Sequence, residues 1–197
     1  MSTYFRTRQK VIDLFDFATT TSTKLNAIIQ NDYLMIIFMK IRILTIGQKM
    51  PAWVDTAFED YFKRIQPFVT TQLIELPMAK RGKNDSDADI LKYCQIEGEA
   101  ILSNIKQGEV LVALEVGGRE LSTEKLAQTM QQWTLDGADI VLAIGGPDGL
   151  SDAVRKAAAW HWSLSKLTLP HPMVRIILIE QLYRAMSINH NHPYHRA

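Results

Sequence analysis

The chain has 197 residues, of which 47% are hydrophobic and 22% are charged. This length fits one domain, and this balance excludes an intrinsically disordered chain. A formal net charge of +1 excludes a generally basic nucleic-acid-coating protein, and a single cysteine, Cys94, excludes an intramolecular disulfide.

The lone cysteine and the apolar runs also bear on location. The longest apolar run, residues 33–39, stops at Lys40 and is far short of the roughly 20 apolar residues that cross a bilayer. We therefore expect a cytoplasmic protein with no membrane contact, which suits a reducing compartment. Cys94 falls in helical register with Ile90 and Ile101, which is typical of a core residue and not of a nucleophile.

The first 38 residues differ from the rest. They combine a basic start, an amphipathic stretch over residues 11–17 and a Thr/Ser run over residues 19–23. Two interpretations are open: a genuine, poorly ordered N-terminal extension, or upstream sequence read from an early start codon. We favour the second, because residues 39–47 open directly as an alternating strand that ends in glycine. The predicted domain spans residues 39–197.

From residue 39 onward, strands and helices alternate strictly. The first strand ends at Gly47, and further strands are predicted at residues 69–76, 110–116, 140–144 and 164–169. Helices are predicted at residues 52–65, 87–105, 123–135, 151–159 and 173–188. This order is typical of an α/β fold with a parallel sheet and helices on both faces. General rules alone favour an unknotted doubly wound sheet, since knots are rare.

A glycine-rich turn follows the strand at residues 140–144. In parallel sheets, ligands bind where strands end and loops lead into helices. The turn reads Gly145-Gly146-Pro147-Asp148-Gly149, so a ligand has room to approach its backbone, although a plain tight turn has the same composition. Its spacing matches neither the GxGxxG dinucleotide motif nor a P-loop.

A second candidate segment, residues 162–172, runs into Pro170-His171-Pro172. Each proline ends the hydrogen-bond ladder and holds the preceding residue extended. Such a rigid corner can frame an adenine ring with backbone amides. The alternative is a stiff strand-to-helix connection in which His171 is a loop histidine.

The C-terminal tail, residues 189–196, is rich in hydrogen-bonding, stacking and cationic groups. From residue 155 to the end there are six Lys or Arg, one acidic residue and all five histidines. RNA recognition uses these side chains. A solvated tail and an adventitious histidine metal site are the alternatives, and the lack of a nearby carboxylate or cysteine argues against a dedicated metal site.

The predicted last helix is apolar on nearly all sides, which is typical of a helix that is buried and contributes to a dimer interface. Glu180 and Arg184 are four residues apart on it, so we expect them to form an ion pair.

Five motifs in this order resemble the SPOUT-class methyltransferases that act on pseudouridine in large-subunit ribosomal RNA. The motifs are Lys49-Met50-Pro51 with Trp53, the basic loop at residues 80–84, the glycine turn with Leu150-Ser151, residues 162–172, and residues 180–196. The resemblance covers residues 39 to almost the last.

The resemblance implies a trefoil-knotted α/β domain that forms a homodimer through the knotted helices. It implies S-adenosylmethionine as methyl donor, no metal, and N3 of a pseudouridine in 23S ribosomal RNA of the assembled ribosome as acceptor. The residues that match the cofactor-binding positions are Leu114, Gly145, Gly146, Leu164, Ser165, Lys166, Leu167, Thr168 and Leu169.

The acceptor nitrogen must lose a proton, and residue type suggests roles for the tail. His195 is the candidate base, with water as the alternative; Arg196 stabilises a carbonyl oxygen or grips phosphate, and Tyr194 stacks on the base. In a dimer the tail can serve the partner's site. Two other hypotheses stay open: a nucleotide-binding α/β enzyme, and a non-catalytic ribosome-binding factor.

Overall fold

The structure is a computed structural model that describes residues 39–196, with side chains up to His195; the predictions for residues 1–38 lie outside this part. The described residues fall within one compact unit of the chain. Its elements are β1 Lys40–Ile46, α3 Ala52–Ile65, β2 Thr70–Leu76, α4 Asp87–Ser103, β3 Glu109–Glu120, α5 Thr123–Leu135, β4 Asp139–Ile144, α6 Asp152–Ala157, β5 Trp160–Ser163, α7 His171–Asn189 and the 3₁₀ helix η1 Pro193–Arg196.

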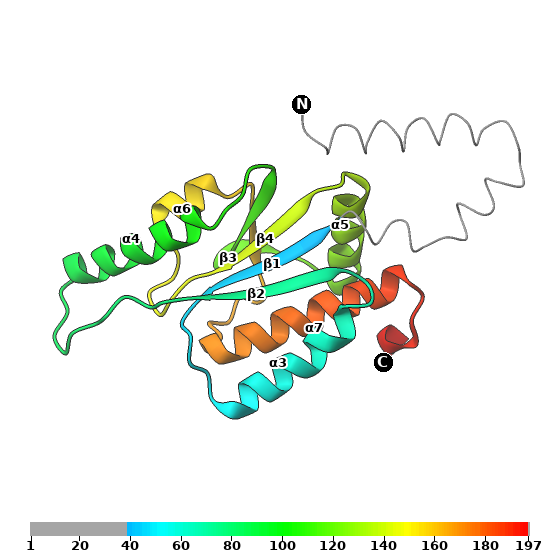
Figure 1. The fold of residues 1–197 in the computed structure, drawn as a ribbon, viewed down its shortest axis with the longest axis horizontal. Coiled ribbons are helices and arrows are strands. Elements are labelled where there is room, and N and C mark those ends of the chain that lie inside the picture. Colours follow the sequence, from blue (N-terminus) through cyan, green and yellow to red (C-terminus); the bar gives the residue numbers. More distant parts are fainter. Residues whose placement is uncertain (1–38, 197) are drawn as a thin grey trace, which may run out of the picture. The chain divides into compact units, whose positions relative to one another are not determined.

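The five strands form one parallel sheet in the order β2-β1-β4-β3-β5. Helices α4 and α6 cover one face, whereas α3, α5 and α7 cover the other, as Figure 1 shows. The central strands β1 and β4 are almost wholly buried because both faces are covered, which explains why residues 140–144 of β4 include no polar side chain. The α/β architecture predicted from strict alternation is confirmed.

Local signals set several helix boundaries. Ser86 caps α4 in a capping box with Asp89, and Ser151 caps α6 by accepting a hydrogen bond from the backbone of Val154. Gly137 adopts a positive φ of 63° just after α5. The predicted bounds of α3 and α5 match those observed.

Two predictions around the last helix are wrong. Residues 164–169 form a loop, and the strand of this region is β5, which ends at Ser163. Helix α7 begins at His171 instead of after the second proline, because Pro172 lies in the first turn, where the missing N–H has no helical partner.

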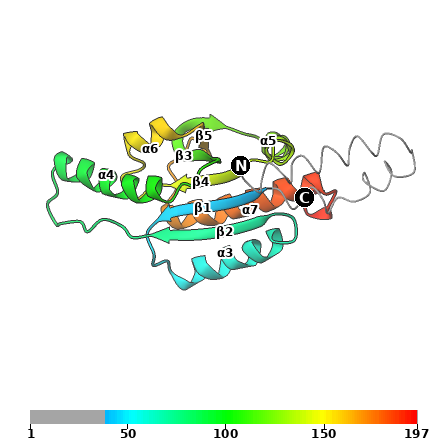
Figure 2. The same ribbon diagram turned by 45° about the horizontal axis from the view of Figure 1, so that its top comes forward.

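Helix α7 returns across the sheet. Strand β5 is the sheet edge next to β3, yet α7 packs against α3 and α5. Arg175, near the start of α7, contacts Gly47 and Glu75 at the ends of β1 and β2. Residues 164–170, which we call the crossing segment, therefore pass over the carboxyl ends of the inner strands. In Figure 2 the arrowheads of β1 and β2 point away from the end that carries η1. No helix between residues 39 and 196 is long and apolar enough to cross a membrane.

Candidate active site

A cavity of about 610 Å³ lies at the carboxyl ends of β3, β4 and β5. Three chain segments form its walls: the end of β3, the glycine turn, and the crossing segment with the start of α7. Of the nine residues matched to cofactor-binding positions, eight line it, namely Leu114, Gly145, Gly146, Leu164, Ser165, Leu167, Thr168 and Leu169. Lys166 does not, since its side chain is 86% exposed and lies 3.6 Å from Glu120.

The glycine turn, residues 145–149, closes tightly on itself. The N–H of Gly149 donates to the carbonyl of Gly146 at 3.0 Å, and Gly149 has a φ of 85°. A Cβ on Gly145 would lie 2.4 Å from the backbone carbon of Gly149. The glycines are therefore required by the protein's own packing, and this tight turn forms a wall of the cavity.

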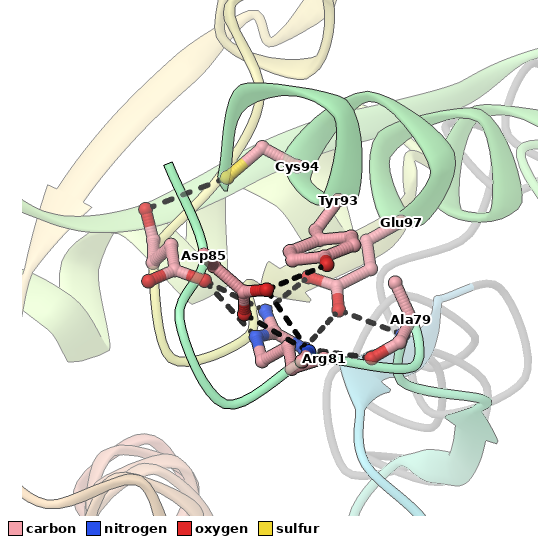
Figure 3. A network of polar contacts seen from close by, with 8 residues as sticks. Ala79, Arg81, Asp85, Tyr93, Cys94 and Glu97 are labelled. Atoms are coloured by element: carbon pink, nitrogen blue, oxygen red, sulfur yellow. Dashed lines mark hydrogen bonds and ion pairs between the residues drawn. The ribbon is translucent and has the colours of Figure 1, made fainter. Parts of the chain in front are cut away.

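An ionic cluster around one buried carboxylate holds the outer side of the turn (Figure 3). We call Arg81, Glu97 and Asp148 the clasp. The carboxylate of Glu97 is 2% exposed and accepts hydrogen bonds from the backbone of Ala79 and from Arg81, both at 2.9 Å. Arg81 also donates to Asp148 of the turn at 2.8 Å. The clasp thus ties the loop after β2, helix α4 and the glycine turn together.

Neighbouring contacts complete this cluster. Asp85 accepts from the backbone of Gly82 at 3.0 Å and from the hydroxyl of Tyr93 at 3.0 Å, so the basic loop folds back onto α4. The thiol of Cys94 lies 3.7 Å from the carbonyl of Asp148, and burial raises its pKa. Cys94 is a buried residue, as its helical register predicts.

Charged residues that the sequence reading missed stand on the opposite wall. Glu115 follows Leu114 on β3 and accepts from Arg155 Nε at 2.8 Å; His161 Nδ1 lies 2.5 Å from its other oxygen. Burial opposes ionisation of Glu115, but hydrogen bonds from His161 and Arg155 outweigh it and lower its pKa. Glu115 and Arg155 line the cavity. The position of Glu115 at the end of a buried strand was the available signal.

The crossing segment is shaped by its serines. Ser163 donates to the carbonyl of Ser165 at 2.8 Å, and the Ser165 hydroxyl accepts from the backbone of Leu167 at 3.0 Å. These local bonds curl the chain around the cavity. They leave the side chain of Leu167 72% exposed at its mouth.

The C-terminal tail lies at the other end of α7. His190 contacts Phe68, with 4.9 Å between ring centroids, in the loop that precedes β2. Because α7 has 19 residues, its ends are separated by about 28 Å. Within one chain, the structure does not bring the tail and the cavity together.

Tyr194 anchors the tail to its own subunit. Its hydroxyl lies 3.1 Å from Oε1 of Glu180 and 3.3 Å from the hydroxyl of Tyr61, and its ring lies under the Arg184 guanidinium at 4.8 Å. Burial, followed by these hydrogen bonds, raises the pKa of Tyr194. The predicted ion pair of Glu180 and Arg184 is confirmed at 2.7 Å.

His195 and Arg196 close η1 beyond this anchor. His195 is half-buried, and its Nδ1 is buried with no hydrogen-bond partner among the described residues. Of Arg196 the structure describes the backbone position only. Tyr194 is thus already packed within its own subunit, whereas His195 keeps an unused ring nitrogen.

The sequence and the fold are both similar to those of known proteins. A family model described as "Predicted SPOUT methyltransferase" matches residues 39–195. Over 159 residues, 81% of this chain and 100% of the relative, the chain is 87% identical to "Ribosomal RNA large subunit methyltransferase H" of Acinetobacter baylyi. It is 56% identical to the protein of the same name from Psychrobacter cryohalolentis, over 80% of this chain and 99% of that protein.

Among solved structures, a probable methyltransferase from Bordetella pertussis superposes with a TM-score of 0.50 at 11% identity, covering 79% of this chain and 99% of that one. This likeness concerns the fold alone. Together with the parallel sheet and the family match, it confirms the fold class that the resemblance implied, the α/β trefoil-knot fold of SPOUT methyltransferases. That class replaces the unknotted sheet favoured by general rules.

Proposed function

This chain belongs to the SPOUT methyltransferase family, and we propose that it methylates N3 of a pseudouridine in 23S ribosomal RNA, with S-adenosylmethionine as donor. The observation that carries the proposal is a cavity bounded by the glycine turn and the crossing segment, in a chain 87% identical to a protein named as a large-subunit ribosomal RNA methyltransferase. We further propose that the substrate is the assembled ribosome in the cytoplasm.

The cavity fits the proposed donor in size and in chemistry. About 610 Å³ lies within the range of sites that enclose molecules of this size. Leu114, Ile144 and Leu169 offer apolar surface for an adenine ring, and the backbone of the glycine turn comes close enough for hydrogen bonds. Glu115 and Arg155 place opposite charges on one wall, which suits a group with both an ammonium and a carboxylate.

The donor supplies an electrophilic methyl group on a sulfonium, so the protein's main task is alignment. The two cavity loops would fix the donor, while the acceptor nitrogen forms its new bond to carbon as the carbon–sulfur bond breaks. The proton of the acceptor nitrogen passes to a base, for which His195 is the candidate and water the alternative. Arg196 would stabilise the carbonyl oxygen that becomes more negative, or bind phosphate.

The position of the tail makes a second subunit part of the proposal. No described side chain of the tail lines the cavity of its own chain, so the tail serves a cavity only if another copy brings the two together. Val174, Ile176 and Ile177 on the first half of α7 are half-buried in the single chain, so an apolar face is available for a homodimer. In such a dimer each tail would face its partner's cavity.

Transfer of labelled methyl from S-adenosylmethionine tests the proposal. Assembled ribosomes, free large subunits and naked 23S RNA serve as parallel substrates, with the product nucleoside identified by mass spectrometry. We expect label in a methylated pseudouridine, with assembled ribosomes as the best substrate. Label on another nucleoside, or transfer to naked RNA alone, would contradict the substrate. Thermal stabilisation by ATP or a dinucleotide instead of S-adenosylmethionine would favour a nucleotide-binding enzyme, and stabilisation by none of these ligands a ribosome-binding factor.

A further inference from the structure

His171 joins three elements around the cavity. It is the first residue of α7 and lines the cavity wall. Its Nε2 lies 3.3 Å from Nε of Arg175 and 3.2 Å from the hydroxyl oxygen of Thr45 on β1. Gly145 of the glycine turn lines the same cavity, with its backbone near the ring. One imidazole therefore links the crossing segment to the turn that follows β4.

The partners of the ring define its protonation state. Arg175 can only donate, so Nε2 must accept, and the single hydrogen of a neutral imidazole sits on Nδ1. In the Gly145 backbone, the group that can accept a hydrogen bond from Nδ1–H is the carbonyl oxygen. The neutral ring thus satisfies both neighbours at once.

Arg175 is held in place from its other side. It is 2% exposed, and its two terminal nitrogens donate to the carboxylate of Glu75 and to the carbonyl of Gly47. With the terminal nitrogens engaged, the remaining Nε–H is directed at His171. The guanidinium is therefore a fixed donor facing the ring, and it has little freedom to turn away.

We propose that neutral His171 is a positioning residue that keeps the glycine turn and the crossing segment in register, and that protonation of its ring loosens the cavity. A second proton would place an N–H on Nε2 against the N–H of Arg175, so a hydrogen bond would become a contact between two donors and two positive charges. That a loosened cavity binds S-adenosylmethionine more weakly rests on the proposed function; the coupling of the two loops does not.

The surrounding charges favour the neutral ring. Arg175 faces it directly, Glu75 is reached through Arg175, and Glu115 and Arg155 face it across the cavity. Burial and then the charge of Arg175 lower the pKa of His171, with the backbone of Gly145 opposing them. Because the folded pKa is depressed, the positioning effect is complete above the ordinary histidine value of about 6.5 and is lost as pH falls through the lower folded value.

Calorimetric titration of the full chain with S-adenosylmethionine between pH 7.5 and pH 5 tests whether protonation of His171 weakens cofactor binding. In the wild type, affinity should be constant near neutrality and then fall by up to about tenfold per pH unit, as one proton must be released. His171→Gln keeps an acceptor and a donor without titrating, so its affinity should stay flat over this range. His190→Gln removes a histidine at the far end of α7 and should retain the wild-type slope.

Hydrogen–deuterium exchange of the cofactor-free protein tests the positioning role separately. Residues 144–150 and 164–170 should exchange faster at pH 5 than at pH 7.5 in the wild type, after correction for intrinsic rates, and His171→Gln should show no such change. Absence of S-adenosylmethionine binding at every pH would overturn the proposed function. The exchange result alone would then decide the positioning role of His171. Equal pH dependence of the wild type and His171→Gln would overturn the role of His171.

Discussion

The carboxylate of Glu97 occupies the place where a side chain at Gly146 would begin. An added Cβ would lie 2.5 Å from Oε2 of Glu97 and 3.2 Å from the Ile46 side chain. Glu97 is buried and held by the backbone of Ala79 and by Arg81, so it cannot swing aside freely. The absence of a side chain at Gly146 and the presence of a buried charge on α4 are thus one structural feature.

This relationship predicts the effect of Gly146→Ala. The methyl group must displace the Glu97 carboxylate or move the turn, so we expect a loss of ~1–3 kcal/mol in the free energy of unfolding and weaker S-adenosylmethionine binding. Urea denaturation and calorimetric titration measure the two effects. Gly117→Ala is the matched stability control, because a Cβ there meets no atom within 4 Å. Unchanged stability and affinity in Gly146→Ala would contradict this prediction, because they would show that the turn shifts without loss of free energy.

The clasp predicts an asymmetric response to loss of Arg81. Arg81→Ala leaves the buried Glu97 carboxylate without its cation and frees Asp148, so we expect a destabilisation of ~2–4 kcal/mol in chemical denaturation. Adding Glu97→Gln to Arg81→Ala removes the stranded charge and should recover part of the loss. Arg64→Ala breaks an exposed pair with Asp60, in which both side chains are about half exposed, and should have a much smaller effect. Equal effects of the two arginine variants would contradict a structural role for the clasp.

Burial of Cys94 predicts that its thiol reacts slowly with alkylating reagents. The raised pKa keeps it protonated at neutral pH, and the side chain is enclosed between α4 and the glycine turn. Iodoacetamide at pH 7.5 should therefore modify the native protein far more slowly than the urea-unfolded protein, as followed by mass spectrometry. Comparable rates in both states would show that this part of α4 opens readily.

The glycine turn was predictable as a cavity wall because ligands bind at the carboxyl ends of parallel strands. Leu114 and residues 164–169 were expected there only through the family resemblance, since the sequence does not show that β3 pairs with β4. The strand at residues 164–169 was not correctly predicted. Its alternation marks extended chain, but the hydrogen bonds of Ser163 and Ser165 curl the segment past the sheet edge instead of pairing it.

The position of the tail could not be predicted from the sequence. Its residue types indicate a function, but where the tail lies depends on the direction in which α7 packs against α3 and α5. No periodicity encodes that direction, and the contact of Tyr194 with Tyr61 spans 133 positions in sequence. The same limit applies to Glu115 with Arg155, whose pairing depends on how α6 packs beside β3.

Tyr194 is expected to act through the packing of the tail. Tyr194→Phe keeps the ring against Tyr183 and Arg184 but loses the hydroxyl contacts with Glu180 and Tyr61, so methyl transfer should fall only several-fold. Tyr194→Ala releases the tail and should reduce the rate far more, with cofactor affinity unchanged in both. A Phe variant as inactive as the Ala variant would assign a chemical role to the hydroxyl.

The separation of tail and cavity predicts complementation between two inactive subunits. A subunit lacking residues 193–197 keeps its cavity, and a subunit with Gly146→Leu keeps its tail; each homodimer should be inactive in methyl transfer, and the truncated one should still bind S-adenosylmethionine. In a mixed dimer, purified through two affinity tags, one cavity would meet one intact tail if the tail serves the partner, so about half of the wild-type rate should return.

If the tail served its own subunit, neither site of the mixed dimer would be complete, and no activity would return. The packing of the tail argues for recovery. Tyr194 is held by Glu180 and Arg184, and no described tail side chain lines its own subunit's cavity, so the tail cannot reach that cavity without unpacking. Thermal melting of each variant guards against the trivial outcome that Gly146→Leu prevents folding. An inactive mixed dimer of folded subunits would therefore refute tail action on the partner.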